Sequence, residues 1–176
     1  MRLNFLFILF FSLFSFGQSE RDLFMVDSIQ NSILDLKLND SIKLGVAHYK
    51  IGEIYRYAQS NDSAYYYYLT AEKVFRNLNS KLLLARTLYG ISSIQSDEKV
   101  YTEAEVNSIE AISLLESIPD SYDVNKYKSF LYNGLGINFN ELEQYEESIR
   151  YHEKSLEIRR RLDDKNRIDH SLNNIG

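Results

Sequence analysis

The side chains that could carry chemistry are few, and they form no recognised catalytic pattern. The chain has three histidines, but it contains no HExxH metal motif, nucleophile elbow, P-loop or glycine-rich dinucleotide motif. His170 follows Asp169, yet no third ligand or nucleophile has a fixed relation to this pair. His48 and His152 fall at positions where bulky residues recur, which favours packing. We therefore predict no enzyme, no catalytic or metal site and no cofactor within these residues.

The composition predicts a single folded domain that does not bind nucleic acid. The 176 residues suit one domain, and 44% apolar residues with only one proline argue against a disordered chain. The net charge of −5 weighs against nucleic acid, which requires a clustered basic surface. The absence of cysteine excludes disulfides and thiolate chemistry. The 14 tyrosines suit half-buried helix faces, where the ring packs and the hydroxyl stays hydrated.

The first residues are typical of an export signal. A basic second residue precedes the apolar run Leu3–Phe16, which is shorter than the roughly 20 residues that span a bilayer. Ser15 and Gly17 place small residues where a signal peptidase acts. We predict a signal peptide over 1–17, cleavage between Gly17 and Gln18, and a periplasmic or cell-envelope location. An uncleaved anchor and a buried N-terminal helix are the alternatives.

Apolar residues at three- and four-residue spacing predict helices along the rest of the chain. Pro119 ends one of them, and the segment SIPDSYD lengthens the connection that follows. The expected helices cover about 19–38, 41–58, 62–78, 80–95, 100–117, 123–140 and 144–162.

Small residues recur in one register, which indicates repeated helix hairpins. Gly52, Ser92, Gly136 and Gly176 are separated by 40, 44 and 40 residues (52→92, 92→136, 136→176). Three further columns keep the same offsets, namely Ala64/Ala104/Ser148, Tyr68/Ser108/His152 and Ala71/Ala111/Ser155. A bulky column, His48/Leu88/Tyr132/Leu172, precedes the small one by a turn. Small residues let helices approach to about 8–10 Å, and each hairpin must stack on the next to bury its apolar face.

This register predicts an all-α solenoid of antiparallel helix hairpins. The expected units are an introductory helix over 18–39, repeats over 40–79, 80–119 and 120–163, and the first half of a fourth repeat over 164–176.

Two clusters allow more than one interpretation. Arg159, Arg160 and Arg161 end a helix that begins with glutamates, which matches the helix dipole and favours a solvated helix end; an anion site is the alternative. The four tyrosines Tyr65–Tyr68 cannot share one helix face. We expect Tyr68 to point inward and the others to spread over the hairpin interface and outer face, with a partner-binding patch as the alternative.

Several segments resemble tetratricopeptide repeats. The first-helix signature is resembled by IGEIY, GLGINF and LNNIG, at Ile51–Tyr55, Gly134–Phe139 and Leu172–Gly176. The second-helix signature is resembled by Asp62–Ala71 and Tyr145–Leu162. The period of about 40 looks like the long variety found in many bacterial signalling proteins. The resemblance implies a right-handed superhelical solenoid that binds protein or peptide on a concave side lined by first helices.

The candidate contacts lie on these first helices. Asparagine offers a donor and an acceptor together and can hold a peptide backbone, and tyrosine adds contact area. The candidates are Tyr49, Glu53, Arg56, Tyr89, Asn133, Asn140 and Asn173. The alternative is an unused groove with ordinary hydrated residues. The Lys/Asn/Arg clamp with which some relatives hold a terminal carboxylate is not matched.

The repeat pattern breaks off at Gly176, which corresponds to Gly52 and Gly136. We therefore expect the chain to be the N-terminal part of a longer protein. The resemblance implies the exported sensory part of a bacterial signal-transduction protein, with a histidine kinase or helix-turn-helix output beyond Gly176. Membrane contact would come only through the signal segment or a later anchor. A structural self-assembly module of the cell envelope is the alternative.

Overall fold

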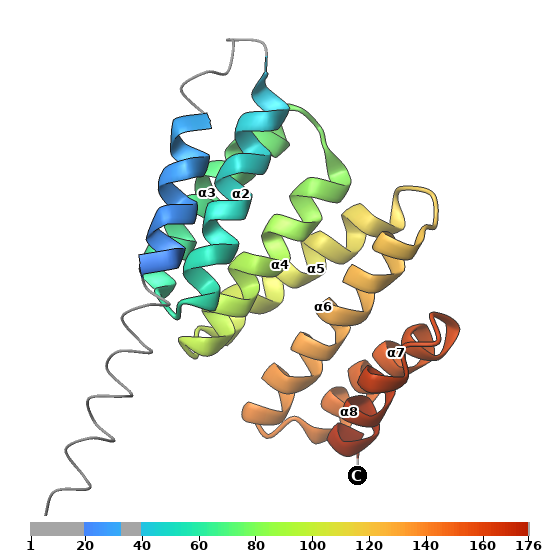
Figure 1. The fold of residues 1–176 in the computed structure, drawn as a ribbon. Coiled ribbons are helices and arrows are strands. Elements are labelled where there is room, and N and C mark those ends of the chain that lie inside the picture. Colours follow the sequence, from blue (N-terminus) through green and yellow to red (C-terminus); the bar gives the residue numbers. More distant parts are fainter. Residues whose placement is uncertain (1–19, 33–39, 176) are drawn as a thin grey trace, which may run out of the picture.

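The computed structural model describes residues 20–32 and 40–175, and in these ranges every regular element is a helix (Figure 1). Residues 20–32 form the first helix. The others are α2 (Ser41–Tyr57), α3 (Asn61–Asn77), α4 (Lys81–Asp97), α5 (Tyr101–Glu116), α6 (Tyr122–Glu141), α7 (Tyr145–Arg161) and α8 (Lys165–Ile175). The predicted signal peptide and the end of the introductory helix lie outside the described residues. None of the described helices combines the length and the apolar character needed to cross a membrane.

The helices pack as a row of antiparallel pairs. The pairs α2–α3, α4–α5 and α6–α7 form hairpins, and contacts between α3 and α4, α5 and α6, and α7 and α8 join each hairpin to the next element. The first helix α4 also contacts both α2 and α6, so the three form one continuous face (Figure 1). The predicted all-α solenoid of antiparallel hairpins is confirmed.

One type of turn ends most of the helices. Gln59, Asn79, Lys99, Glu143 and Asp163 have φ between 50° and 61°, and they recur every 20 residues (59→79→99 and 143→163). After each of them an N–H donates to the carbonyl five residues back, at 2.7–3.1 Å, as Ser60 does to Tyr55. This is the hydrogen bond that closes a helix through a left-handed residue. Because Gln59 makes the reversal, α3 already begins at Asn61, which the sequence pattern had assigned to the turn.

The connection between α5 and α6 differs, as the proline predicted. It contains Pro119, and α6 begins after Ser121, whose hydroxyl accepts a hydrogen bond from the Val124 N–H at 3.2 Å. The serine side chain satisfies one of the free N–H groups at the start of the helix.

The predicted columns of small and inward residues form the interior. The nine residues in the columns that begin with Ala64, Tyr68 and Ala71 are each at most 3% exposed. Gly52, Ser92 and Gly136 are buried as well. The bulky column is less uniform, because Leu88 is fully buried while Leu172 on α8 is 46% exposed.

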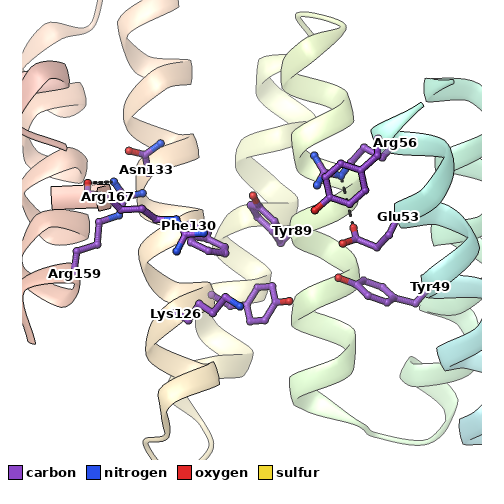
Figure 2. Close-up of a pocket in the computed structure, with 11 residues that line it drawn as sticks. Tyr49, Glu53, Arg56, Tyr89, Lys126, Phe130, Asn133, Arg159 and Arg167 are labelled. Atoms are coloured by element: carbon purple, nitrogen blue, oxygen red, sulfur yellow. Dashed lines mark hydrogen bonds and ion pairs between the residues drawn. The ribbon is translucent and has the colours of Figure 1, made fainter. Parts of the chain in front are cut away.

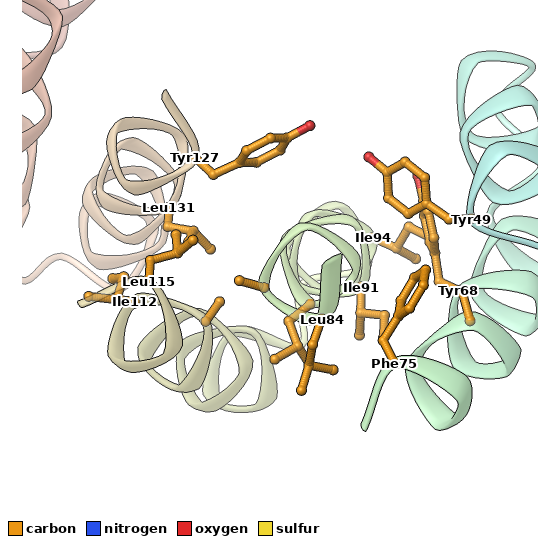
Figure 3. Packing of buried hydrophobic residues seen from close by; sticks show 14 of the residues in the cluster. Tyr49, Tyr68, Phe75, Leu84, Ile91, Ile94, Ile112, Leu115, Tyr127 and Leu131 are labelled. Carbon is orange, nitrogen blue, oxygen red and sulfur yellow. The ribbon is translucent and has the colours of Figure 1, made fainter. Parts of the chain in front are cut away.

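The reason for two of the glycines is a ring on the neighbouring helix. A Cβ atom at Gly52 would lie 2.8 Å from Tyr68 Cδ1, and one at Gly90 would lie 2.7 Å from Tyr68 Cζ. The fully buried Tyr68 ring of α3 is therefore held between the backbones of α2 and α4, within the core shown in Figure 3. Gly136 and His152 repeat the arrangement, because a Cβ at Gly136 would lie 2.6 Å from His152 Cε1.

The other tyrosines of the quartet spread as expected. Tyr66 is 65% exposed, and Tyr65 and Tyr67 are half-buried. The Tyr67 ring stacks on Tyr55 at 5.6 Å, and its hydroxyl accepts a hydrogen bond from Gln30 Nε2 at 2.8 Å. Tyr67 thus joins the helix of residues 20–32 to the first hairpin.

Gly136→Ala and Gly134→Ala test the packing of first helices against inward rings. No heavy atom lies within 4 Å of a Cβ built at Gly134, whereas one at Gly136 meets the buried His152 ring. We expect Gly136→Ala to lower the free energy of unfolding in urea by about 1–3 kcal/mol. Gly134→Ala should raise it by up to about 1 kcal/mol, because alanine favours helix. Equal effects of the two substitutions would contradict this packing.

His152 predicts an acid-sensitive fold. Burial, and secondarily the charge of Arg159, hold the pKa of His152 below its ordinary value of 6.5. The unfolded chain then binds the proton more readily than the folded one, so stability is complete above the unfolded pKa and declines as the pH falls below it. We expect the free energy of unfolding to fall as the pH drops below the ordinary value of 6.5. In His152→Leu the slope should be smaller, with the remainder due in part to His48, whose pKa burial also lowers. An unchanged slope would show that His152 does not contribute.

Candidate functional site

A pocket of about 380 Å³ opens on the face formed by the first helices. Figure 2 shows α2 on one side of it, α4 and α6 in the middle, and α7 and α8 on the other side. The lining residues are Tyr49, Glu53, Arg56 and Tyr57 of α2, Tyr89 of α4, Lys126, Tyr127, Phe130 and Asn133 of α6, Arg159 of α7, and Arg167 of α8.

Three aromatic rings line the middle of the pocket. Tyr89 lies 5.9 Å from Tyr127 and 5.6 Å from Phe130, and the last two lie 5.8 Å apart, measured between ring centroids. Tyr127 and Phe130 meet edge-on, a favourable arrangement of ring quadrupoles. The rings join α4 to α6 and present a preformed aromatic surface.

Arg86 of α4 lies between Tyr49 of α2 and Tyr127 of α6 and contacts both rings. Its guanidinium carbon lies 5.1 Å from the ring centroids of both Tyr49 and Tyr127, and its Nε donates to the Tyr127 hydroxyl at 3.0 Å. Figure 3 shows the hydroxyls of Tyr49 and Tyr127 turned toward each other. Burial and the nearby Glu53 raise the pKa of Tyr49, so its phenol stays neutral and can donate or accept a hydrogen bond.

Glu53 belongs to the packing as well as to the pocket. The hydroxyl of the buried Tyr68 donates to Glu53 Oε1, and Arg56 Nε lies 3.6 Å from the same oxygen. Burial and the Glu53 carboxylate raise the pKa of Tyr68. The core tyrosine therefore positions the only carboxylate among the residues that line this pocket.

Cations predominate in the lining, with Arg56, Lys126, Arg159 and Arg167 against Glu53. Arg167 Cζ lies 4.6 Å from the Phe130 ring centroid, and its Nη1 is 2.7 Å from Asp164 Oδ2. This local excess of positive charge contrasts with the net charge of −5 of the whole chain. A negatively charged ligand would be attracted to this lining.

The solvated helix end expected for the three arginines is wrong for Arg159. Arg160 and Arg161 are exposed, but Arg159 is only 4% exposed. It follows Ser155 and Leu156 by four and three residues, so it shares their inward face. Its Nη1 donates to the Ser171 hydroxyl at 2.6 Å and to the Arg167 carbonyl at 3.0 Å, which joins α7 to α8.

Five of the seven predicted contact residues line the pocket together, namely Tyr49, Glu53, Arg56, Tyr89 and Asn133. Asn140 and Asn173 are exposed and do not line it. It is Asn174, one residue further on, that meets Asn133, donating to its side-chain oxygen at 3.4 Å.

Neighbouring first helices are shifted relative to one another along their axes, and this stagger explains why Asn140 does not line the pocket. On α2 the pocket contacts Tyr49, Glu53 and Arg56, at i, i+4 and i+7, and on α6 it contacts Lys126, Phe130 and Asn133 at the same spacing. Asn133 is the repeat equivalent of Tyr49, so the pocket lies seven residues, or about 10 Å, nearer the start of α6 than the register predicts. The i, i+4, i+7 pattern was visible in the sequence, but the stagger was not. The spacing of Arg159 from Ser155 and Leu156 was a sequence signal for its inward position. No sequence signal distinguished Arg167 from other arginines.

Comparison with known proteins supports the fold but gives no family. No family model matches the chain, and no curated protein matches it. A similar solved structure is the crystal structure of BtubC (BKLC) from P. vanneervenii, with a TM-score of 0.77 and 19% sequence identity. The alignment covers 90% of this chain and 65% of that chain. At this identity the likeness concerns the fold alone.

Tyr68→Phe tests the link between core and pocket. It removes the hydroxyl that donates to Glu53 while keeping the ring between the two glycines. We expect the free energy of unfolding to fall by about 1.5–3 kcal/mol, the range for a hydrogen bond to a charged group. Tyr66→Phe is the matched control, because Tyr66 is 65% exposed, and it should change stability by less than about 0.5 kcal/mol. A loss of similar size in both variants would refute the link.

Proposed function

We propose that this chain is a peptide- or protein-binding scaffold of the tetratricopeptide type, and that the pocket is its ligand site. The main support for this proposal is that four successive first helices, α2, α4, α6 and α8, contribute side chains to one pocket. A ligand that spans them makes contacts with every hairpin at once.

The lining is suited to an extended peptide. The rings of Tyr89, Tyr127 and Phe130 offer rigid contact area at little cost in side-chain entropy. Asn133 can donate to a carbonyl and accept from an N–H, so it can hold a peptide backbone whatever the side chain. The volume of about 380 Å³ is within the usual range for ligand pockets and accommodates a few side chains.

We further propose that the scaffold is exported and works as the sensory part of a longer signalling protein. The support is the N-terminal apolar segment together with the geometry of the pocket. A ligand bridging α2 and α8 would favour one angle between the stacked hairpins, which shifts the population of conformations. Small-angle scattering with and without a bound peptide tests this step, and an unchanged scattering profile at saturation would reject it.

Selection of short random peptides on the chain tests the binding function. Tyr57 lines the pocket and is 73% exposed, so Tyr57→Ala removes contact area at little cost to the fold. We expect Tyr57→Ala and Asn133→Ala each to weaken selected peptides about tenfold, or about 1.4 kcal/mol, in calorimetric titrations.

Tyr66→Ala is the control for this experiment. Tyr66 is a tyrosine of similar exposure on α3 and does not line the pocket, so affinity should be unchanged. The proposal fails if no peptide is selected, or if the selected peptides bind all three variants as they bind the original chain.

A further inference from the structure

Arg159 is a buried cation without an acidic partner among the described residues. It is 4% exposed, and none of the ion pairs in the described part of the chain includes it. Its Nη1 donates to a hydroxyl and a backbone carbonyl, while its Nε has no hydrogen-bond acceptor among the residues that the structure describes. Burying a charge in this way is costly unless an opposite charge is supplied.

The neighbouring lining adds positive charge. Arg167 and Lys126 both flank the Phe130 ring, at 4.6 Å and 5.9 Å from its centroid. The backbone carbonyl oxygen of Arg167 accepts a hydrogen bond from Arg159 Nη1. Asp164 neutralises Arg167 in part, because its Oδ2 lies 2.7 Å from Arg167 Nη1. Burial, and then the charge of Arg167, lower the pKa of Arg159, and the charge of Asp164 opposes this shift only in part.

We propose that Arg159, Arg167 and Lys126 form an oxyanion subsite at the α7–α8 end of the pocket, which binds a carboxylate or phosphoryl group of the peptide ligand. The inference rests on the proposed peptide-binding function and names the chemistry of the ligand: an acidic or phosphorylated segment.

The local geometry favours an oxyanion over a neutral group. The two bonds of Nη1 fix the guanidinium plane, so little side-chain freedom remains to be lost on binding. A carboxylate or phosphoryl group can accept two parallel N–H bonds from an arginine, which a neutral amide oxygen cannot do equally well. Lys126 and Arg167 add charge from α6 and α8.

A purely structural role for Arg159, joining α7 to α8, makes different demands. That role needs Nη1, Ser171 and the Arg167 carbonyl, but it does not need the side chains of Arg167 and Lys126. Substitution of these two therefore separates anion binding from helix docking, and neither is as deeply buried as Arg159.

The test uses inorganic phosphate and acetate as probes, at constant ionic strength maintained with sodium chloride. The arginine Nε–Hε signals are followed by NMR. We expect a saturable shift of the Arg159 signal and none of the Arg160 signal. Arg167→Ala and Lys126→Ala should each weaken the probe about fivefold to tenfold, because each removes one charge from the subsite.

Arg160→Ala is the matched control, since it removes the same charge from the same helix end at an exposed position. It should leave the titration unchanged. Arg159→Lys keeps the charge but loses the planar fork, so it should abolish the saturable shift of the remaining lining signals while the chain stays folded.

The outcomes assign the source of the oxyanion. Saturation by both probes supports a subsite for carboxylates and phosphoryl groups, and saturation by phosphate alone supports a phosphorylated ligand. If neither probe saturates, or if Arg160→Ala weakens binding as much as Arg167→Ala, the subsite is refuted. The peptide selection is independent of this result, so uncharged peptides that bind the pocket would uphold the proposed function while the subsite fails.

Discussion

The structure depends on the close approach of neighbouring helices around a buried ring. Tyr68 is fully buried between Gly52 and Gly90, which belong to α2 and α4, and any side chain at either glycine would overlap the ring. The contact sets the distance between two first helices at the point where the pocket begins. The Tyr68 hydroxyl then extends this constraint to Glu53, which lies in the pocket lining. Packing and site are therefore parts of one arrangement.

The same arrangement recurs with other residues further along the chain. His152 takes the place of Tyr68 and packs on Gly136, while the hydroxyl of Ser148 donates to the Gly136 carbonyl at 2.8 Å. The Ser155 hydroxyl likewise donates to the Ser129 carbonyl at 2.8 Å, so these two serines of α7 make buried hydrogen bonds to α6. Turns with a left-handed residue follow α2, α3, α4 and α7, which have 17 residues each, and α6, which has 20. The contact of a ring with a glycine therefore occurs in the first and the third hairpin.

The charges of the pocket follow from the order of the helices. The face that α2, α4, α6 and α8 share collects side chains from positions more than 100 residues apart, such as Tyr49 and Arg167. Most of the acidic residues lie elsewhere, so a positive pocket forms in a chain of net charge −5. Aromatic rings lie in the middle of the pocket, and Lys126, Arg159 and Arg167 lie toward its α7–α8 end. A ligand with an apolar part and an acidic part would match this arrangement.

The amino-acid pattern alone was sufficient to determine the helices, the hairpins and the buried columns. Helical periodicity and the small residues at Gly52, Ser92 and Gly136 are local properties of the chain. They can be recognised in the sequence without knowing which helices become neighbours. Five pocket residues could be predicted for the same reason, because they lie on the faces that the repeat defines. The tertiary structure alone decided which turns of neighbouring helices lie at the same height. That stagger placed Lys126 and Phe130 in the pocket instead of Asn140, and it brought Arg167 beside Arg159. Contacts between distant helices set the stagger, so no local pattern records it.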